Sequence, residues 1–165
     1  IIDCLKSMQN VFAVSSISIY HISNPTFSYI WKEDRVDESL KNYPDWLIET
    51  MKEGNILSYS CIDQIPDTET VEFFQGEKLI AILLVPLFIG DLCTGFLLLG
   101  DEKGPRVFSK IEINLIHSIS HIYATVSQRL AMRDELTYQH SHDFLTGLYN
   151  RRYLECEVKR LEPEK

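Results

Sequence analysis

Two long apolar runs joined by a two-residue turn place the strongest constraint on this 165-residue chain. The runs extend from Leu79 to Ile89 and from Leu92 to Leu99, with Gly90-Asp91 between them. Because a Gly-Asp pair accepts the positive φ angles of a tight antiparallel turn, this segment is predicted to form a β-hairpin. Both runs are apolar on both faces, so other elements should cover the hairpin above and below.

Helical periodicity appears in three other places. The first is residues 1–12, where Ile1, Leu5, Met8 and Phe12 recur at helical spacing. The second runs from 44 to 53, with a proline at its start and a glycine after its end. The third begins at Ser109, a predicted N-cap that forms a capping box with the glutamate three residues later, and continues to about residue 142.

Short β-branched or alternating segments predict further strands. They cover residues 14–22 and 26–32, which should form a hairpin, and residues 56–61. The acidic residues 63–72 have no clear period and are expected to form a loop or a short helix. The predicted fold is therefore α+β, an antiparallel sheet of five to six strands flanked by N- and C-terminal helices, with a long C-terminal connecting helix.

Charge is distributed unevenly along the chain. The net charge is −8, and residues 1–128 carry all of it, because residues 129–165 hold equal numbers of basic and acidic side chains. A net negative charge disfavours nucleic-acid binding. The longest apolar run is too short for a membrane span. The four cysteines form no Cys-x-x-Cys pair, so reduced thiols and a cytoplasmic location are expected.

Several short motifs surround the predicted hairpin. Its first strand contains Val85-Pro86-Leu87, a glycine lies in the turn, and the return strand contains Gly95-Phe96-Leu97. Phe108-Ser109 with Glu112 then opens the C-terminal helix. In this order, over residues 1 to about 130, these motifs resemble the GAF domains. The resemblance implies a sensory domain with a ligand pocket between the sheet and the loop that covers it.

A second motif follows the long helix. Residues 143–153 read Asp-Phe-Leu-Thr-Gly-Leu-Tyr-Asn-Arg-Arg-Tyr. This resembles the opening of the GGDEF domain of diguanylate cyclases, Asp-x-Leu-Thr-Gly-Leu-x-Asn-Arg-Arg followed by an aromatic residue. The matching residues are Asp143, Leu145, Thr146, Gly147, Leu148, Asn150, Arg151 and Arg152. The expected organisation is a GAF-like sensor over 1–128, a helical linker over 129–142 and a truncated GGDEF start over 143–165.

The catalytic part of such a cyclase is expected to lie beyond Lys165. The sequence contains neither the Gly-Gly-Asp/Glu-Glu-Phe turn nor a glycine-rich phosphate loop. We therefore expect no catalysis by the chain itself and no cofactor in it. Mg²⁺ and GTP are expected only for the missing cyclase domain, which would make cyclic di-GMP. Because the sequence begins at Ile1, we expect it to be a piece of a longer bacterial protein.

Candidate ligand-pocket residues combine aromatic rings with one thiol. They are Tyr59, Cys61, Phe73, Phe74 and Leu83. The same side chains could instead form a second hydrophobic cluster without a ligand. A bilin-binding relative would require a Cys-His pair, whereas Ile62 follows Cys61, and the Asn-Lys-x-Phe-Asp-Glu element of cyclic-nucleotide-binding relatives is absent. The stimulus is thus expected to be an unidentified small molecule or protein partner.

The long helix carries an apolar series at three- and four-residue intervals: Ile116, Ile119, Tyr123, Val126 and Leu130. These residues could pack on their own sheet or against a second copy. In related sensor modules the terminal helices build a dimeric bundle, so a homodimer is expected. A cyclase needs two GTP-loaded domains facing one another, and a change in the register of paired helices would control that encounter.

Histidine and cysteine pairs raise two weaker alternatives. His117 and His121 have the i, i+4 spacing that can chelate a metal, but no third ligand is nearby in the sequence, and we expect ordinary histidines. His140 and His142 point to different sides of a helix. Cys61 and Cys93 could serve a GAF-type methionine sulfoxide reductase if one thiol resolved the other. Structural thiols are the simpler interpretation.

Overall fold

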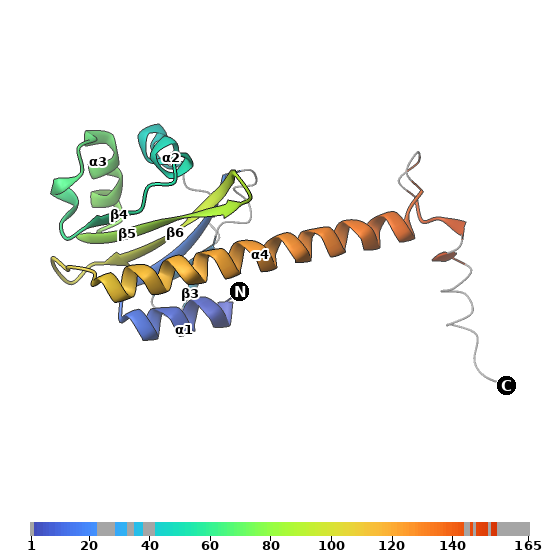
Figure 1. The fold of residues 1–165 in the computed structure, drawn as a ribbon, viewed down its shortest axis with the longest axis horizontal. Coiled ribbons are helices and arrows are strands. Elements are labelled where there is room, and N and C mark those ends of the chain that lie inside the picture. Colours follow the sequence, from blue (N-terminus) through green and yellow to red (C-terminus); the bar gives the residue numbers. More distant parts are fainter. Residues whose placement is uncertain are drawn as a thin grey trace. The chain divides into compact units, whose positions relative to one another are not determined.

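The computed structural model describes residues 2–22, 29–32, 35–37, 42–143, 146, 148–151, 153 and 154. The chain divides into two units, residues 1–124 and 125–165, and each is described by itself. The first unit contains a sheet and the helices that pack on it (Figure 1). No helix of the described part is both long enough and apolar enough to cross a membrane.

An antiparallel sheet forms the centre of the first unit. Over the described residues it has six strands in the order β3-β2-β1-β6-β5-β4. The strand bounds are β1 Ser16–His21, β2 Tyr29–Lys32, β3 Arg35–Asp37, β4 Leu57–Tyr59, β5 Ala81–Ile89 and β6 Leu92–Asp101. The predicted sheet of five to six strands is therefore confirmed. The predicted turn between β1 and β2 lies outside the described residues.

Four α-helices and one 3-10 helix complete the described elements. Their bounds are α1 Ile2–Phe12, α2 Asp45–Lys52, the 3-10 helix Ile62–Gln64, α3 Thr68–Gly76 and α4 Lys110–Ser141. The acidic region is more helical than its lack of periodicity suggested, since α3 extends to Gly76. The Asp67 carboxylate caps α3 by accepting hydrogen bonds from the Thr70 N–H at 2.8 Å and hydroxyl at 2.6 Å.

The central hairpin is buried on both faces, as predicted. In β5, Ala81, Leu83, Val85 and Leu87 join a core cluster with α1 and the first part of α4. Ile82 and Leu84 join a second cluster with α2 and α3. Figure 1 shows α2 and α3 over one side of the sheet and α1 on the other. Because alternate residues of a strand point to opposite faces, one hairpin organises both cores.

Glycine is required at two positions of the hairpin. Gly90 has a φ of +61°, which allows the tight turn between β5 and β6. Gly95 lies beside β1, and a Cβ at this position would approach the Tyr20 carbonyl oxygen to 1.9 Å. A larger residue at position 95 would therefore push β1 away from β6.

The start of α4 has the predicted capping box. The Ser109 N–H donates to Glu112 Oε2 at 2.7 Å, and the Glu112 N–H donates to Ser109 Oγ at 3.2 Å. This reciprocal pair satisfies two backbone donors that a helix start leaves free. The beginning of α4 is thereby defined at Ser109, where the sequence placed it.

Candidate functional site

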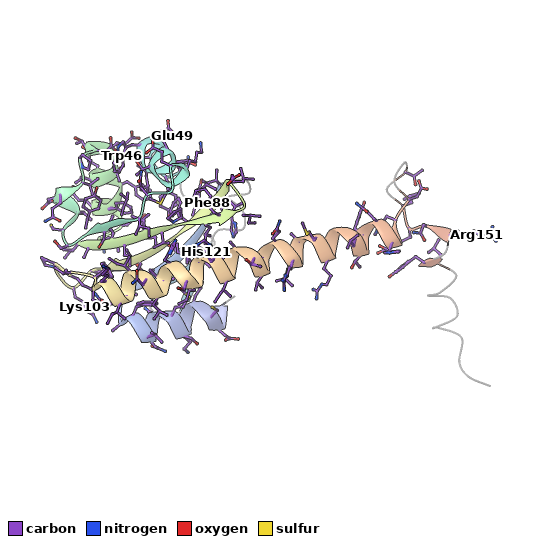
Figure 2. The ribbon with its side chains drawn as sticks, viewed as in Figure 1. Trp46, Glu49, Phe88, Lys103, His121 and Arg151 are labelled. Carbon is purple, nitrogen blue, oxygen red and sulfur yellow. The ribbon has the colours of Figure 1, made fainter. Side chains whose placement is uncertain are left out.

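Five aromatic rings, here called the aromatic cluster, gather between the sheet and the α2–α3 layer. They are Tyr20 of β1, Phe96 of β6, Phe73 and Phe74 of α3, and Tyr43 of the segment before α2. Ring centroids of contacting pairs lie 4.7 to 5.3 Å apart, the range of favourable aromatic packing. Trp46 and Phe88, labelled in Figure 2, pack against the same core.

Tyr43 occupies the middle of the aromatic cluster. Its ring contacts Tyr20, Phe73 and Phe96, and its side chain is almost fully buried. Burial raises the pKa of its hydroxyl far above the usual range, although a side-chain hydrogen bond with Ser18 acts in the opposite direction. Tyr43 differs from the other four because it comes from a connecting segment, not from a strand or helix.

The predicted pocket residues lie in three different settings. Phe74 is completely buried, and Phe73 and Tyr59 are partly buried against the same core. Cys61 is half-buried just after β4, where its thiol donates to Asp63 Oδ2 at 3.4 Å. Leu83 belongs to the α1–α4 cluster, so its prediction as a pocket residue is wrong. The reason is strand alternation: its neighbours Ile82 and Leu84 face the aromatic cluster.

The two cysteines of the reductase hypothesis are not brought together. Tyr59, two residues before Cys61, pairs with Ile82 at one end of β5, whereas Cys93 pairs with Phe88 near the other end. Those two β5 positions are about 20 Å apart at the usual strand rise. The Cys93 thiol is buried, donates to the Gly95 carbonyl at 3.4 Å, and has a pKa raised by burial. This arrangement contradicts a reductase in which one of these thiols resolves the other.

A guanidinium connects the helices on the opposite side of the sheet. Arg106 lies in the loop between β6 and α4, close in sequence to Lys103 in Figure 2. It donates to the carbonyls of Phe12 at 2.6 Å and Ala13 at 3.0 Å, and to Glu112 Oε1 at 2.6 Å. It also approaches Asp101 Oδ2 at 3.5 Å. We call Arg106 with these four partners the Arg106 junction.

Both carboxyl groups of the Arg106 junction have lowered pKa values. Burial alone would raise the pKa of Asp101, but hydrogen bonds from the Lys103 N–H, the Ser15 hydroxyl and Arg106 more than compensate. For Glu112, burial is likewise outweighed by hydrogen bonds from Ser109 and by Arg106. The fold therefore stabilises the ionised form of both groups.

Three residues of the predicted dimer series on α4 face their own domain. Ile116 is completely buried, and Ile119 and Tyr123 pack against the same cluster of β-sheet and α1 side chains. Tyr123 also has its hydroxyl 3.1 Å from His21 Nε2 on β1. Of the two alternatives, packing on their own sheet is therefore the one that the structure shows for these three residues. Val126 and Leu130 are exposed.

A different apolar stripe of α4 is open to solvent. Ile111, Leu115 and Ile122 are 80%, 43% and 64% exposed. They lie at four- and seven-residue intervals, which keeps them on one helical face, and Ser118 occupies the intermediate position of this heptad pattern. We call Ile111, Leu115 and Ile122 the exposed stripe.

The second unit holds the motif of residues 143–153. Asp143 Oδ1 accepts hydrogen bonds from the Thr146 N–H and hydroxyl, both at 3.0 Å. The Asn150 N–H donates to the Ser141 carbonyl at 2.8 Å, and its side-chain amide donates to the His140 carbonyl at 2.7 Å. Asn150 thereby satisfies two carbonyls at the end of α4. Leu148 is exposed, Arg151 is helical, and Leu145, Gly147 and Arg152 lie outside the described residues.

Stacked rings reinforce this turn. Tyr138 stacks on His142 with ring centroids 4.0 Å apart, His142 contacts Tyr149 at 4.4 Å, and Tyr149 stacks on Tyr153 at 4.8 Å. Residues 142 and 149 also form a β-bridge. Tyr149, at a position that the motif leaves open, therefore helps to hold the turn against the end of α4 through its contact with His142.

The two histidines at i, i+4 on α4 contact each other. The rings of His117 and His121 meet edge to face, with centroids 4.7 Å apart (His121 is labelled in Figure 2). Within the described residues, no group of three or more His, Cys, Asp or Glu side chains could hold a metal ion.

Comparison with known proteins supports the fold. The PixJ GAF domain of Thermosynechococcus elongatus, in its blue-light-absorbing form, is 20% identical, with a TM-score of 0.62 and coverage of 86% of this chain and 91% of that chain. A domain assigned to a two-component sensor histidine kinase of Sinorhizobium meliloti is 17% identical, with a TM-score of 0.61 and coverage of 83% and 92%. The chain therefore has a GAF fold.

Sequence relatives cover less of the chain. Uncharacterized proteins of Mycobacterium bovis and Mycobacterium tuberculosis are 39% identical to it over 85 residues, which is 51% of this chain. The matched region spans only 13% of the length of those curated relatives. No protein-family profile matches the chain.

The sequence analysis did not identify the central residue of the aromatic cluster, Tyr43, or that of the Arg106 junction, Arg106. Tyr43 stands next to Pro44, but a single tyrosine in a connecting segment has no periodicity to reveal it. Arg106 follows Gly104-Pro105, and its partners are mainly backbone carbonyls that are distant in sequence. No local pattern could have identified either residue.

The carboxylates of the Arg106 junction should make stability depend on pH. A carboxylate with a lowered folded-state pKa contributes stability above its unfolded pKa, and that contribution is lost as the pH falls through the folded value. We expect the thermal unfolding midpoint to decrease as the pH falls below about 4.5. Glu112→Gln should reduce this decrease.

Glu69→Gln provides the matched control because Glu69 is an exposed residue in the first turn of α3. Thermal unfolding followed by circular dichroism between pH 6 and pH 3 measures the effect. Equal pH slopes for wild type and Glu112→Gln would contradict the assigned role of this carboxylate.

Proposed function

We propose that the chain is the sensory and transmission part of a bacterial diguanylate-cyclase-type signalling protein. In this proposal residues 1–128 form a cytoplasmic GAF sensor, residues 129–142 a helical linker, and residues 143–165 the start of a GGDEF domain. The observation that carries the proposal is helix α4, which runs without interruption from Lys110 to Ser141 and ends directly before the motif that begins at Asp143. In this proposal the chain supplies the input and the connection, and the cyclase chemistry belongs to the output domain that the helix serves.

The aromatic cluster is the proposed ligand site. Its rings come from two strands, one helix and one connecting segment, and they belong to a hydrophobic core. The Tyr43 side chain places a flat ring in the aromatic cluster and forms a hydrogen bond with Ser18. A neutral aromatic compound with one hydroxyl group could make the same contacts in its place. The ligand would enter by replacing the Tyr43 ring; residues 42–44 belong to no strand or helix, so their displacement would break no β-ladder.

Removal of the Tyr43 ring should create a binding site for p-cresol, which has the shape of the tyrosine side chain. We expect Tyr43→Ala to lose about 3 kcal/mol of stability and p-cresol to restore much of it. Wild type should bind p-cresol more weakly, because its own ring competes. Thermal shift and isothermal titration calorimetry measure both effects.

Leu87→Ala is the matched control for this experiment. Leu87 of β5 is fully buried but belongs to the α1–α4 cluster, so its loss should destabilise the fold without creating a p-cresol site among the rings. Absence of p-cresol binding to folded Tyr43→Ala would contradict the ligand site. Binding to Tyr43→Ala but none to wild type at millimolar p-cresol would contradict exchange of the ring and favour a module without a ligand.

A homodimer through α4 is the proposed route of transmission. The exposed stripe is apolar and repeats at heptad spacing, which suits a two-helix contact with a second copy. Val126 and Leu130 continue the exposed apolar surface further along the helix. Pairing would bring two output domains onto one dimer, as cyclic di-GMP synthesis from two GTP molecules requires.

A charge within the exposed stripe should dissociate this dimer. Ile122→Lys is expected to shift the sedimentation coefficient from dimer to monomer, because two lysines would face each other in an apolar contact. His117→Lys changes an exposed residue on another side of the same helix and should leave the dimer intact. A monomeric wild type, or a dimer unaffected by Ile122→Lys, would contradict the proposal.

The linker should act through its helical register. Deletion of four residues within 129–142, in a longer protein where a cyclase domain follows this chain, rotates whatever follows by about 40° and shortens the helix by about 6 Å. Cyclic di-GMP formation should change at least severalfold. Deletion of seven residues nearly preserves the helical phase and provides the control. Unchanged activity after the four-residue deletion would contradict transmission through this helix.

A further inference from the structure

The contacts of Arg106 reach four separate parts of the first unit. Its main-chain N–H donates to the Ser60 carbonyl at 3.0 Å, in the segment that follows β4. Its guanidinium bonds to the end of α1 through the Phe12 and Ala13 carbonyls and to the first turn of α4 through Glu112. Asp101 at the end of β6 is the fourth contact.

The guanidinium is suited to this position by its geometry and charge. The last carbonyls of α1 have no partner within the helix, and they form the negative end of its dipole. Ala13 has a φ of +48°, which turns the chain out of α1 and leaves its carbonyl within reach of Arg106. A planar fork with several donors can serve two carbonyls and a carboxylate together, whereas an ammonium group cannot do so with the same geometry.

The segment after β4 packs on the side of the sheet that α2 and α3 cover, which is the side opposite α1. Ser60 Oγ donates to Gln64 Oε1 at 3.2 Å, which links the residue after β4 to the last residue of the 3-10 helix. Tyr59 precedes this turn and packs against the core that contains the aromatic cluster, and Ile62 and Ile65 are buried in that core. A movement of residues 60–64 would therefore displace the carbonyl that holds the Arg106 backbone.

We infer that Arg106 couples the 60–64 turn, on the aromatic side of the sheet, to the first turn of α4 and the end of α1. It is a positioning residue: it sets where α4 begins relative to the sheet, and it transmits a displacement of residue 60 to Glu112. This inference rests on the proposed sensory function, because it assigns a route from the ligand site to the transmission helix. A simple salt bridge would add stability but would not link these two segments energetically.

The test measures that link without any ligand. Gln64→Ala removes the side-chain bond within the 60–64 turn, and hydrogen exchange of the Ile113 amide, which donates to the Ser109 carbonyl, reports on the first turn of α4. Exchange of Leu98 in β6 provides the reference for global unfolding. In the wild-type background Gln64→Ala should speed Ile113 exchange, relative to Leu98, about twofold or more. In the Arg106→Gln background the same substitution should have no effect.

Two further variants complete the design. Lys103→Gln removes a positive charge from an exposed residue of the same loop, so the effect of Gln64→Ala should persist. Arg106→Lys keeps the charge but loses the fork, so the effect should fall at least by half, and this variant replaces Arg106→Gln if the latter does not fold. An equal effect of Gln64→Ala in all backgrounds, or no effect in wild type, would overturn the inference. Because p-cresol is not used, this result is independent of whether the ligand site is correct.

Discussion

Burial of the β5–β6 hairpin on both faces is the constraint on which the rest of the structure depends. Every residue from Ala81 to Leu87 is buried, so neither face of this strand can be left to water. Side-chain alternation divides these residues between two cores, one closed by α1 and α4 and the other by α2 and α3. Removal of either helical layer would expose half of the hairpin.

The cores on the two sides of the sheet contain different kinds of side chain, and we propose a different role for each side. The α2–α3 side gathers aromatic rings around Tyr43, which suits recognition of a flat neutral compound. The α1–α4 side is largely aliphatic and is fastened by Arg106, Asp101 and Glu112. The 60–64 turn connects the two sides, because it packs into the core that contains the aromatic cluster and accepts a hydrogen bond from the Arg106 backbone.

Predictions from sequence succeeded where a local pattern had one physical meaning. The Gly90 turn, the capping box at Ser109 and the helical period of α1 each depend on neighbours within a few residues. The predictions failed where a side chain could pack against more than one neighbouring element. Leu83 was assigned to the ligand side because it is apolar, but in a strand buried on both faces apolar character does not identify the face.

What the sequence alone determined is the set of elements, the antiparallel hairpin at their centre and the long helix that precedes Asp143. What only the tertiary structure decided is which side of each element meets which neighbour. By sequence, Ile116, Ile119 and Tyr123 could meet their own sheet or a second copy. In the packed chain they lie in the core with the sheet, while Ile111, Leu115 and Ile122 are exposed. The physical reason is that periodicity records that a face is buried, whereas only the packed chain shows what buries it. Arg106 follows the same rule, since backbone carbonyls brought from residues 12 and 13 are invisible in the sequence around it.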